Sequence, residues 1–464
     1  MSSTKIIAGG YGFLCDEENR NGFLNIAVRS NLVLEVSKDL DGLRRKYPEA
    51  EMVDASNKII LPTLFNAHFH PESLITRFVE SRIPISQWTS GDLLHLEAAL
   101  DSQDESFYER MYHLTFFSAL QSGVATVAFS VIGDEPGARG MFSAVKLTGV
   151  DAVAFAESEQ QISFLRRIVD RHLKSGVFVP YQKDLTLFGL SAVARNNADS
   201  PGWIMTHADE DPADTLTTKS NFNSGIIHLL RKSKILSSST ILVGLNGTPG
   251  ASLKIAKSSG AKIVIIPQNL NAQTFKSIRN IYRHFAVGSN WETPGLFLQM
   301  KRLLELGCEP EEVLMSVTRS GAELFNMGSK LGSIESGKVA SLAFIDATKL
   351  SARRLEIMPA DSAVTAFIED YSDSDVSDVM LDGEFVYKDR KLLLYDTGEL
   401  LNEEKDLIKI LSGQTESVAP TVEPKSPALR TQEMNVESVN EVEQGSKKVE
   451  LPKNIRKVFG EDEF

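Results

Sequence analysis

Apolar positions in the central part of the chain follow two spacings in turn, which predicts alternating helices and strands. Residues 105–122 carry apolar side chains three and four apart, the spacing of a helix, and the apolar run 124–131 follows as a strand. Repeated units of this kind indicate a parallel sheet covered by helices, so we expect an α/β fold. The other predicted strands are 150–156, 177–180, 185–190, 202–206, 240–245, 262–266 and 286–288, and the other predicted helices are 159–174, 225–236 and 250–259.

The two ends of the chain have a different pattern, with short apolar stretches between turn residues. The N-terminal stretches predict strands at 5–8, 24–28, 32–36, 51–55 and 58–61. Near the other end, residues 379–387 predict a hairpin that turns at Asp382-Gly383. The N-terminal strands are too short to close a core alone, so we expect them to pack against another part of the chain.

The stretch 59–70 carries the clearest chemical signal and reads I-I-L-P-T-L-F-N-A-H-F-H. Side chains alternate faces along a strand, so His68 and His70 point one way and Phe69 points the other. Two imidazoles at the end of a buried strand can bind one metal ion at the rim of a barrel. The alternative is two ordinary surface or capping histidines, because an isolated H-x-H motif is a weak signal.

A second apolar strand is followed by polar and acidic residues in the stretch 203–210, which reads W-I-M-T-H-A-D-E. His207 closes this strand and is a third candidate metal ligand. Glu210 lies in the loop that follows, from which its carboxylate can return toward the metal and carry protons. In the alternative interpretation, His207 bonds a backbone carbonyl and Glu210 belongs to a solvated acidic loop. Three neutral histidines suffice for zinc with one position open.

Composition narrows the class of protein. A chain of 464 residues with 42% apolar residues has room for a barrel of about 250 residues and a second domain. The net charge of −13 argues against a nucleic-acid surface, and no apolar run is long enough to span a membrane. Cys15 and Cys308 form no C-x-x-C pattern, and the N-terminus shows no signal peptide, so we expect a cytoplasmic protein with reduced thiols.

The motifs resemble those of the amidohydrolase superfamily, especially its deaminase and chlorohydrolase branch. That branch reads proline-glycine-leucine and then asparagine-alanine-His-x-His, and Thr63 here replaces the glycine. Residues 84–88 (P-I-S-Q-W) resemble its leucine-glutamate-tryptophan turn, and residues 121–127 resemble its serine-glycine-threonine-threonine strand. Residues 331–343 are similar to its entry into a C-terminal sandwich. The resemblance covers roughly residues 5 to 395.

The resemblance implies a TIM-like (β/α)8 barrel at residues 63–327. It also implies a small composite β-sandwich made from residues 1–62 and 328–395. A closing helix is expected at 396–412. The segment 413–464 is rich in Ser, Glu, Pro, Val, Thr and Gln with few aromatic residues, which predicts a disordered tail with a possible docking motif for a protein partner at its end.

The resemblance also implies a site. His68, His70 and His207 would bind one divalent metal, zinc or iron, and Glu210 would act as the catalytic proton carrier. Asn290 stands where the family has a metal-binding aspartate, and it can still offer a carbonyl oxygen. No lysine stands where a carboxylated lysine would bridge two metals, so we expect a single metal. The predicted substrate-pocket residues are Arg77, Trp88, Pro267, Asn269 and Glu292.

Two departures from the family pattern bear on activity. The usual sixth-strand histidine is replaced by Gly244, and the usual eighth-strand aspartate by Asn290. Loss of one acid–base group typically lowers a rate by about 10²–10⁴. Glu292 replaces the missing carboxylate only if its loop bends back toward the metal.

We therefore expect an amidohydrolase-like metal-dependent hydrolase of the deaminase type. It would act on C–N bonds of a small-molecule substrate, with weakened or lost activity. The alternative is a non-catalytic pseudoenzyme that serves as a binding or scaffold protein. We also expect a homodimer with no nucleic-acid or membrane partner.

Overall fold

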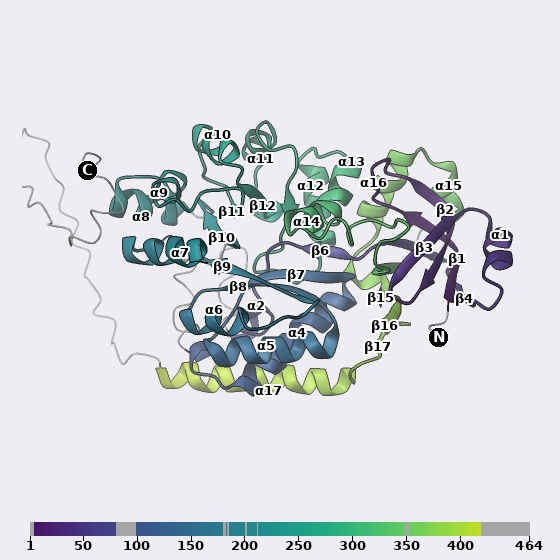
Figure 1. Ribbon diagram of the computed structural model, residues 1–464, viewed down its shortest axis with the longest axis horizontal. Helices are drawn as coiled ribbons and strands as arrows, with labels where there is room; N and C mark the ends of the chain where they lie inside the picture. Colours follow the sequence, from purple (N-terminus) through teal and green to yellow (C-terminus); the bar gives the residue numbers. More distant parts are fainter. Residues whose placement is uncertain are drawn as a thin grey trace, which may run out of the picture.

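The computed structural model describes residues 4–79, 99–179, 182, 185–199, 202–210, 212–348 and 352–418. It contains an eight-stranded sheet and a nine-stranded sheet, which occupy opposite ends of the molecule (Figure 1). Trp88 and residues 419–464 of the predicted tail lie outside the described residues. Among the described residues, no helix is both long enough and apolar enough to span a bilayer.

The eight-stranded sheet is parallel throughout and runs in sequence order from the first strand to the last. Its ends meet where Ala67 N donates to Val287 O at 2.9 Å, so the sheet closes into the predicted barrel. Its strands are β6 (Leu64–Asn66), β7 (Val124–Ser130), β8 (Asp151–Ala156), β9 (Leu173–Phe178), β10 (Trp203–Ala208), β11 (Thr240–Gly244), β12 (Lys262–Ile265) and β13 (Ala286–Val287).

Alternate strand residues fill the barrel interior. Val153 and Phe155 of β8 belong to an inner cluster that also contains Phe325, whereas Ala152 and Ala154 pack in the larger cluster with the surrounding helices. The helices of the barrel are α2 (Ser73–Val79), α4 (Glu105–Gln121), α5 (Glu135–Thr148), α6 (Glu159–Leu165), α7 (Leu187–Asp199), α8 (Pro212–Phe222), α9 (Ile226–Lys232), α10 (Gly250–Ser258), η3 (Pro267–Asn269), α11 (Ala272–Arg279), α12 (Phe297–Glu305), α13 (Pro310–Ser316) and α14 (Arg319–Leu324).

The nine-stranded sheet joins the two ends of the chain, as predicted. β5 pairs antiparallel with β14, with Leu342 opposite Pro62 and Asp346 opposite Lys58. All nine strands are hydrogen-bonded as one sheet, which folds over so that Val33 N donates to Lys338 O at 2.9 Å. The strands are β1 (Thr4–Phe13), β2 (Asn21–Arg29), β3 (Leu32–Ser37), β4 (Glu51–Asp54), β5 (Lys58–Pro62), β14 (Leu342–Asp346), β15 (Val376–Leu381), β16 (Glu384–Lys388) and β17 (Lys391–Leu392).

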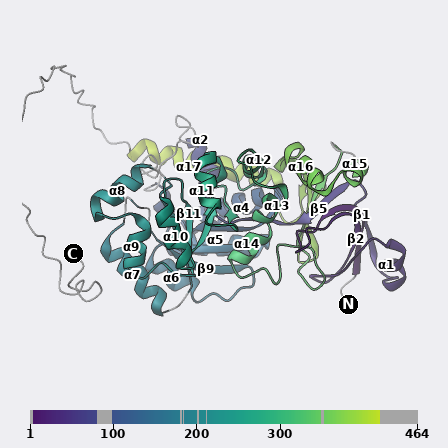
Figure 2. The ribbon, with the colours of Figure 1, turned by 90° about the horizontal axis from the view of Figure 1, so that it is seen from above.

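Short helices flank this sheet, and Figure 2 shows them on the side away from α7 and α8. They are α1 (Leu40–Lys46), α15 (Ala352–Ile357), α16 (Ala360–Asp370) and η4 (Asp373–Asp375). The sequence analysis assigned no helix between β14 and β15, so α15 and α16 are additions to the prediction. α16 buries Phe367 against Phe13 of β1, with ring centroids 5.1 Å apart, which ties it to the sheet.

Two predicted elements of the barrel were wrong. The helix predicted at 159–174 ends at Leu165, and Leu173 already begins β9, because it pairs with Ala152 of β8. Most of the strand predicted at 185–190 belongs to α7, which begins at Leu187 and buries Leu190 and Val193 one turn apart. A short apolar run fits a buried strand or one helix face equally well, and here helix packing decided the outcome.

The closing helix is α17 (Thr397–Val418), which packs against α2 and α4. It runs beneath the barrel helices in Figure 1. Leu400, Leu407 and Leu411 are its buried contacts, and Tyr395 just before it donates to Glu403 at 2.9 Å. The helix continues beyond residue 412, where the sequence analysis ended it, so the first residues assigned to the tail are helical.

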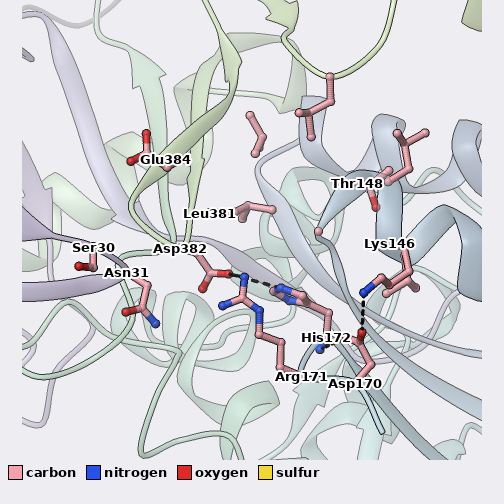
Figure 3. A pocket seen from close by; sticks show the side chains of 15 residues that line it. Ser30, Asn31, Lys146, Thr148, Asp170, Arg171, His172, Leu381, Asp382 and Glu384 are labelled. Atoms are coloured by element: carbon pink, nitrogen blue, oxygen red, sulfur yellow. Dashed lines mark hydrogen bonds and ion pairs between the residues drawn. The ribbon is translucent and has the colours of Figure 1, made fainter. Parts of the chain in front are cut away.

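The barrel and the nine-stranded sheet also meet at the amino-terminal end of the barrel strands. There a cavity of about 820 Å³ lies between the two (Figure 3). Arg171 and His172, just before β9, both reach Asp382, with Arg171 Nη2 2.8 Å and His172 Nε2 3.4 Å from its Oδ2. Asp382 is in the predicted turn and has φ +50°, as a tight Asp-Gly hairpin requires.

Candidate metal centre

His68 and His70 follow β6 in a segment that is clamped between its neighbours. Phe69 N donates to Ala128 O at 2.9 Å, and Ser289 N and Asn290 N both donate to His68 O, at 3.0 and 3.1 Å. Phe69 is buried among the outer core residues, so the two histidines face the opposite way, as their spacing predicts. The backbone therefore fixes both imidazoles at the carboxyl end of the barrel.

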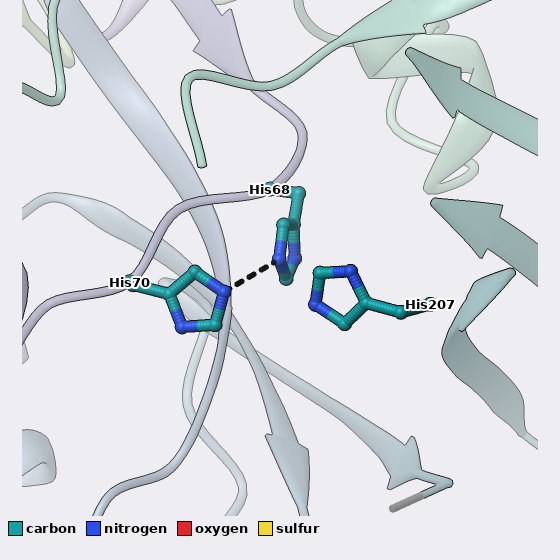
Figure 4. Close-up of side chains that lie close together, drawn as sticks. All are labelled: His68, His70 and His207. Atoms are coloured by element: carbon teal, nitrogen blue, oxygen red, sulfur yellow. Dashed lines mark hydrogen bonds between the residues drawn. The ribbon is translucent and has the colours of Figure 1, made fainter. Parts of the chain in front are cut away.

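His207, at the end of β10, completes a group of three histidines (Figure 4). One nitrogen from each lies within 4.8 Å of the others, and His68 Nε2 is 3.2 Å from His70 Nε2. All three side chains are buried. Burial lowers the pKa of His68 well below its ordinary value, and the neighbouring His207 and His70 lower it further. The imidazole of His68 is thus suited to the neutral, metal-binding form.

The donor set fits a divalent metal. Three buried imidazoles that converge at ligand spacing match the protein ligands of a zinc site, and imidazole also suits iron. His68 Nδ1 is buried and has no hydrogen-bond partner in the described parts of the chain. Two carboxylates contact the cluster: Glu72 Oε1 is 3.1 Å from His70 Nδ1, and Glu210 Oε2 bonds His207 Nδ1.

Glu210 is held from several sides. Besides His207, its carboxylate accepts from Asn290 Nδ2 at 2.8 Å and from Asn269 Nδ2 at 3.1 Å. Burial raises the pKa of Glu210, but the adjacent His207 and the hydrogen bonds lower it by more, so its pKa lies below the ordinary value. Glu210 is therefore an ionised carboxylate beside the histidine cluster, where the sequence analysis expected the proton carrier.

Known proteins are similar to this chain along most of its length. The sequence profile described as "Amidohydrolase family" matches residues 59–386. The chain belongs to the amidohydrolase family. A 5-methylthioadenosine/S-adenosylhomocysteine deaminase of Pyrococcus abyssi is 20% identical over 435 residues, which cover 87% of this chain and 98% of that protein. A 5′-deoxyadenosine deaminase of Methanococcus vannielii is 24% identical over 415 residues, covering 78% and 89%.

Solved structures agree with this amidohydrolase in fold. An adenosine deaminase from Xanthomonas campestris with bound zinc superposes with a TM-score of 0.77 at 16% identity, covering 89% of this chain and 99% of that one. An atrazine chlorohydrolase from Arthrobacter aurescens complexed with zinc gives a TM-score of 0.71 at 17% identity, covering 87% and 99%. The likeness confirms the predicted barrel with a separate sheet domain.

Gly244 and Asn290, the two residues that depart from the amidohydrolase pattern, both have a positive φ. Gly244 has φ +92°, and a Cβ there would lie 2.8 Å from the Cβ of Glu210. A histidine side chain therefore does not fit at this position in the present backbone. Asn246, which follows, points its amide nitrogen to Glu210 O at 3.1 Å. Asn290 has φ +56°, and its Oδ1 is buried without a partner among the described residues.

The predicted pocket residues of this amidohydrolase divide into two groups. Asn269 contacts Glu210, and Pro267 is buried at the start of η3 beside it. Arg77 and Glu292 are half-buried and outside the histidine group. Burial raises the pKa of Glu292, and Arg77 opposes that rise. Glu292 therefore interacts electrostatically with Arg77. It is outside the histidine group, so it does not replace the missing metal-binding carboxylate in this conformation.

The sequence analysis missed two residues of the site. Glu72 contacts His70, and Trp291 stacks on His70 with ring centroids 3.7 Å apart and planes 4° from parallel. The acid two residues after H-x-H is a signal in the sequence, but acids are common before a helix, so the signal is weak. Nothing in the local pattern placed Trp291, because it reaches His70 only through the closure of the barrel.

Proposed function

We propose that this amidohydrolase is a metal-dependent deaminase that hydrolyses a C–N bond of an adenosine-type nucleoside. The observation that carries the proposal is the hydrogen-bonded pair His207–Glu210 beside His68 and His70. This arrangement combines three candidate histidine ligands with a carboxylate that is bonded to one of them. The substrate class comes from the relatives, whose names specify 5-methylthioadenosine, S-adenosylhomocysteine and 5′-deoxyadenosine.

Each residue has a defined part in the proposed reaction. His68, His70 and His207 would hold one zinc or iron, and such a metal lowers the pKa of a bound water to about 7 and so supplies a nucleophile. Glu210 accepts a proton from the attacking water and returns it to the leaving amine. Asn269 and Asn290 hold the Glu210 carboxylate in position for both transfers.

The proposed turnover is slow. Gly244 offers no side chain to orient or polarise the attacking water. Asn290 brings no charge beside the metal and accepts no proton. Because each lost acid–base group typically costs about 10²–10⁴ in rate, we expect a rate well below that of a deaminase with both groups.

A second candidate is a metal-binding protein without turnover. The observation that favours it is the number of groups on Glu210: one oxygen bonds His207 and the other accepts from both Asn269 and Asn290. A carboxylate held this way is a good structural element and a poor mobile base. In this candidate the barrel would serve as a binding or scaffold protein.

The deciding experiment is ammonia release from adenosine, 5′-deoxyadenosine, 5′-methylthioadenosine and S-adenosylhomocysteine by protein reconstituted with zinc or with iron. Glu210→Gln is the matched control, because it keeps the size of the side chain and removes the base. Turnover that disappears in Glu210→Gln supports the deaminase. Tight metal binding with no turnover on any of the four nucleosides supports the non-catalytic candidate. The homodimer, a partner for the tail and a cytoplasmic location stay predictions.

A further inference from the structure

Glu72 is a buried carboxylate directly behind His70. It lies between the histidine segment and α2, and its backbone carbonyl accepts from Thr76 N at 2.9 Å and from the Thr76 hydroxyl at 3.0 Å. These bonds fix the backbone of Glu72 at the start of the helix. Its side chain turns back to His70, with Glu72 Oε1 3.1 Å from His70 Nδ1.

The hydrogen bonding of Glu72 is incomplete. The residue is 6% exposed, and its Oε2 has no hydrogen-bond partner in the parts of the chain that the structure describes. A buried carboxylate is costly unless positive charge lies nearby. A metal ion bound by His70 Nε2, which lies 3.2 Å from His68 Nε2, would supply such charge on the far side of the ring.

Glu72 and Trp291 constrain different properties of the same ring. Trp291 stacks flat on His70 and so fixes the plane of the imidazole. Stacking does not choose between the two tautomers. The carboxylate of Glu72 accepts the proton of Nδ1, which leaves the lone pair of Nε2 directed to the histidine cluster. Outer-shell carboxylates of this kind orient a ligand and raise its basicity.

We propose that Glu72 is a positioning residue for the metal ligand His70 and that it supplies the negative charge that Asn290 does not. Glu72 on His70 and Glu210 on His207 place two carboxylates next to the cluster of three imidazoles. Two negative charges balance one divalent cation without a carboxylate ligand from the eighth strand. This inference rests on the metal site of the proposed function and not on its turnover.

The test is the zinc affinity of chelator-stripped protein, measured by competition with a chromophoric chelator at fixed pH. Glu72→Gln keeps the shape and a hydrogen-bond acceptor but removes the charge, and Glu72→Ala removes both. We expect zinc affinity to fall roughly 10–100-fold in Glu72→Gln and at least as much in Glu72→Ala. The thermal midpoint of metal-free Glu72→Gln should equal or exceed that of the wild type, because an unbalanced buried charge is gone.

Asp151→Asn is the matched control. Asp151 is another carboxylate that contacts a histidine, with Oδ1 2.9 Å from His172 Nδ1, and it begins β8 at the opposite end of the barrel. Its zinc affinity should stay at the wild-type value. A reduced affinity at the metal site in this variant would mean that buried carboxylates act there through general stability, which would overturn the inference.

Three further outcomes would overturn it. Zinc affinity of Glu72→Gln within about twofold of the wild type would show that the charge of Glu72 does not matter for metal binding. If zinc affinity falls in Glu72→Ala but not in Glu72→Gln, the hydrogen bond to His70 matters for metal binding and the charge of Glu72 does not. A lower thermal midpoint of metal-free Glu72→Gln than of the metal-free wild type would show that Glu72 stabilises the fold itself. Wild-type protein that binds zinc but releases no ammonia would refute the deaminase while leaving the role of Glu72 standing.

Discussion

Gly244 and Glu210 approach each other so closely that a Cβ on residue 244 would stand 2.8 Å from the Cβ of Glu210. The two residues lie on neighbouring strand ends, where Ala208 of β10 pairs with Gly244 of β11. The loss of the sixth-strand histidine is therefore coupled to the position of the proposed base. In this backbone a side chain at residue 244 would take up the space that Glu210 now occupies.

The first prediction is that a side chain at residue 244 destabilises the protein. Gly244→Ala should lower the free energy of unfolding by about 1–3 kcal/mol for the left-handed backbone, and the steric contact with Glu210 adds to this. Gly244→His should cost more and should not restore activity. Urea unfolding measures both. Gly250→Ala is the control, because Gly250 starts α10 with open space around it. Equal stability of Gly244→Ala and wild type would contradict the prediction.

The second prediction concerns the metal. His207→Ala should abolish stoichiometric zinc or iron in the purified protein, since it removes one of three ligands. The loss of affinity should exceed the roughly 10–100-fold typical of an outer-shell change. Metal content by mass spectrometry is the measurement, with His228→Ala, an exposed position on α9, as the control. Metal retained in His207→Ala at the wild-type level would refute the three-histidine site.

The third prediction is that Asn290→Asp destabilises the metal-free protein but strengthens zinc binding. Asn290→Asp places a carboxylate where an amide now donates to Glu210 at 2.8 Å. Without metal, the two like charges should repel and lower the thermal midpoint. With zinc, the new carboxylate can bind the metal, so zinc affinity should rise.

The matched control for that experiment is Asn326→Asp. Asn326 also has a left-handed backbone, φ +54°, but it is exposed and away from the cluster. It should change neither the metal-free midpoint nor the zinc affinity. If Asn290→Asp binds zinc more weakly than the wild type, Asn290 does not stand at the metal.

The fourth prediction is a pH dependence at the junction in Figure 3. Hydrogen bonds to Asp151 and Asp382 raise the pKa of His172 to about 9. Because the pKa is higher in the folded than in the unfolded state, this contribution to stability is complete below pH of about 6.5 and is lost as the pH rises through about 9. Urea unfolding between pH 6 and 10 should show the loss.

His172→Gln should remove this part of the pH dependence, since glutamine does not titrate. His228→Gln, at an exposed position, should keep it. Identical pH profiles for His172→Gln and the wild type would show that the His172 pairs do not contribute to the stability of the junction.

The sequence by itself determined the local features of this protein. Strand periodicity put His68 and His70 on one face, and the apolar run before His207 placed it at a strand end. The Asp382-Gly383 pair specified its hairpin turn. Such signals depend on neighbouring residues and on backbone preferences that hold in any fold, so they can be recognised without the rest of the molecule.

Only the tertiary structure decided which groups meet. Barrel closure placed Asn290 and Trp291 beside the histidines, and the left-handed turn at Gly244 gave Glu210 its position. Helix packing made 187–199 a helix where the apolar pattern also allowed a strand. The carboxylate of Glu72 gained its partner because a fixed turn directs it back to His70. These outcomes depend on contacts between distant segments, whose geometry is set by close packing of the whole barrel and leaves no signal in a local stretch of sequence.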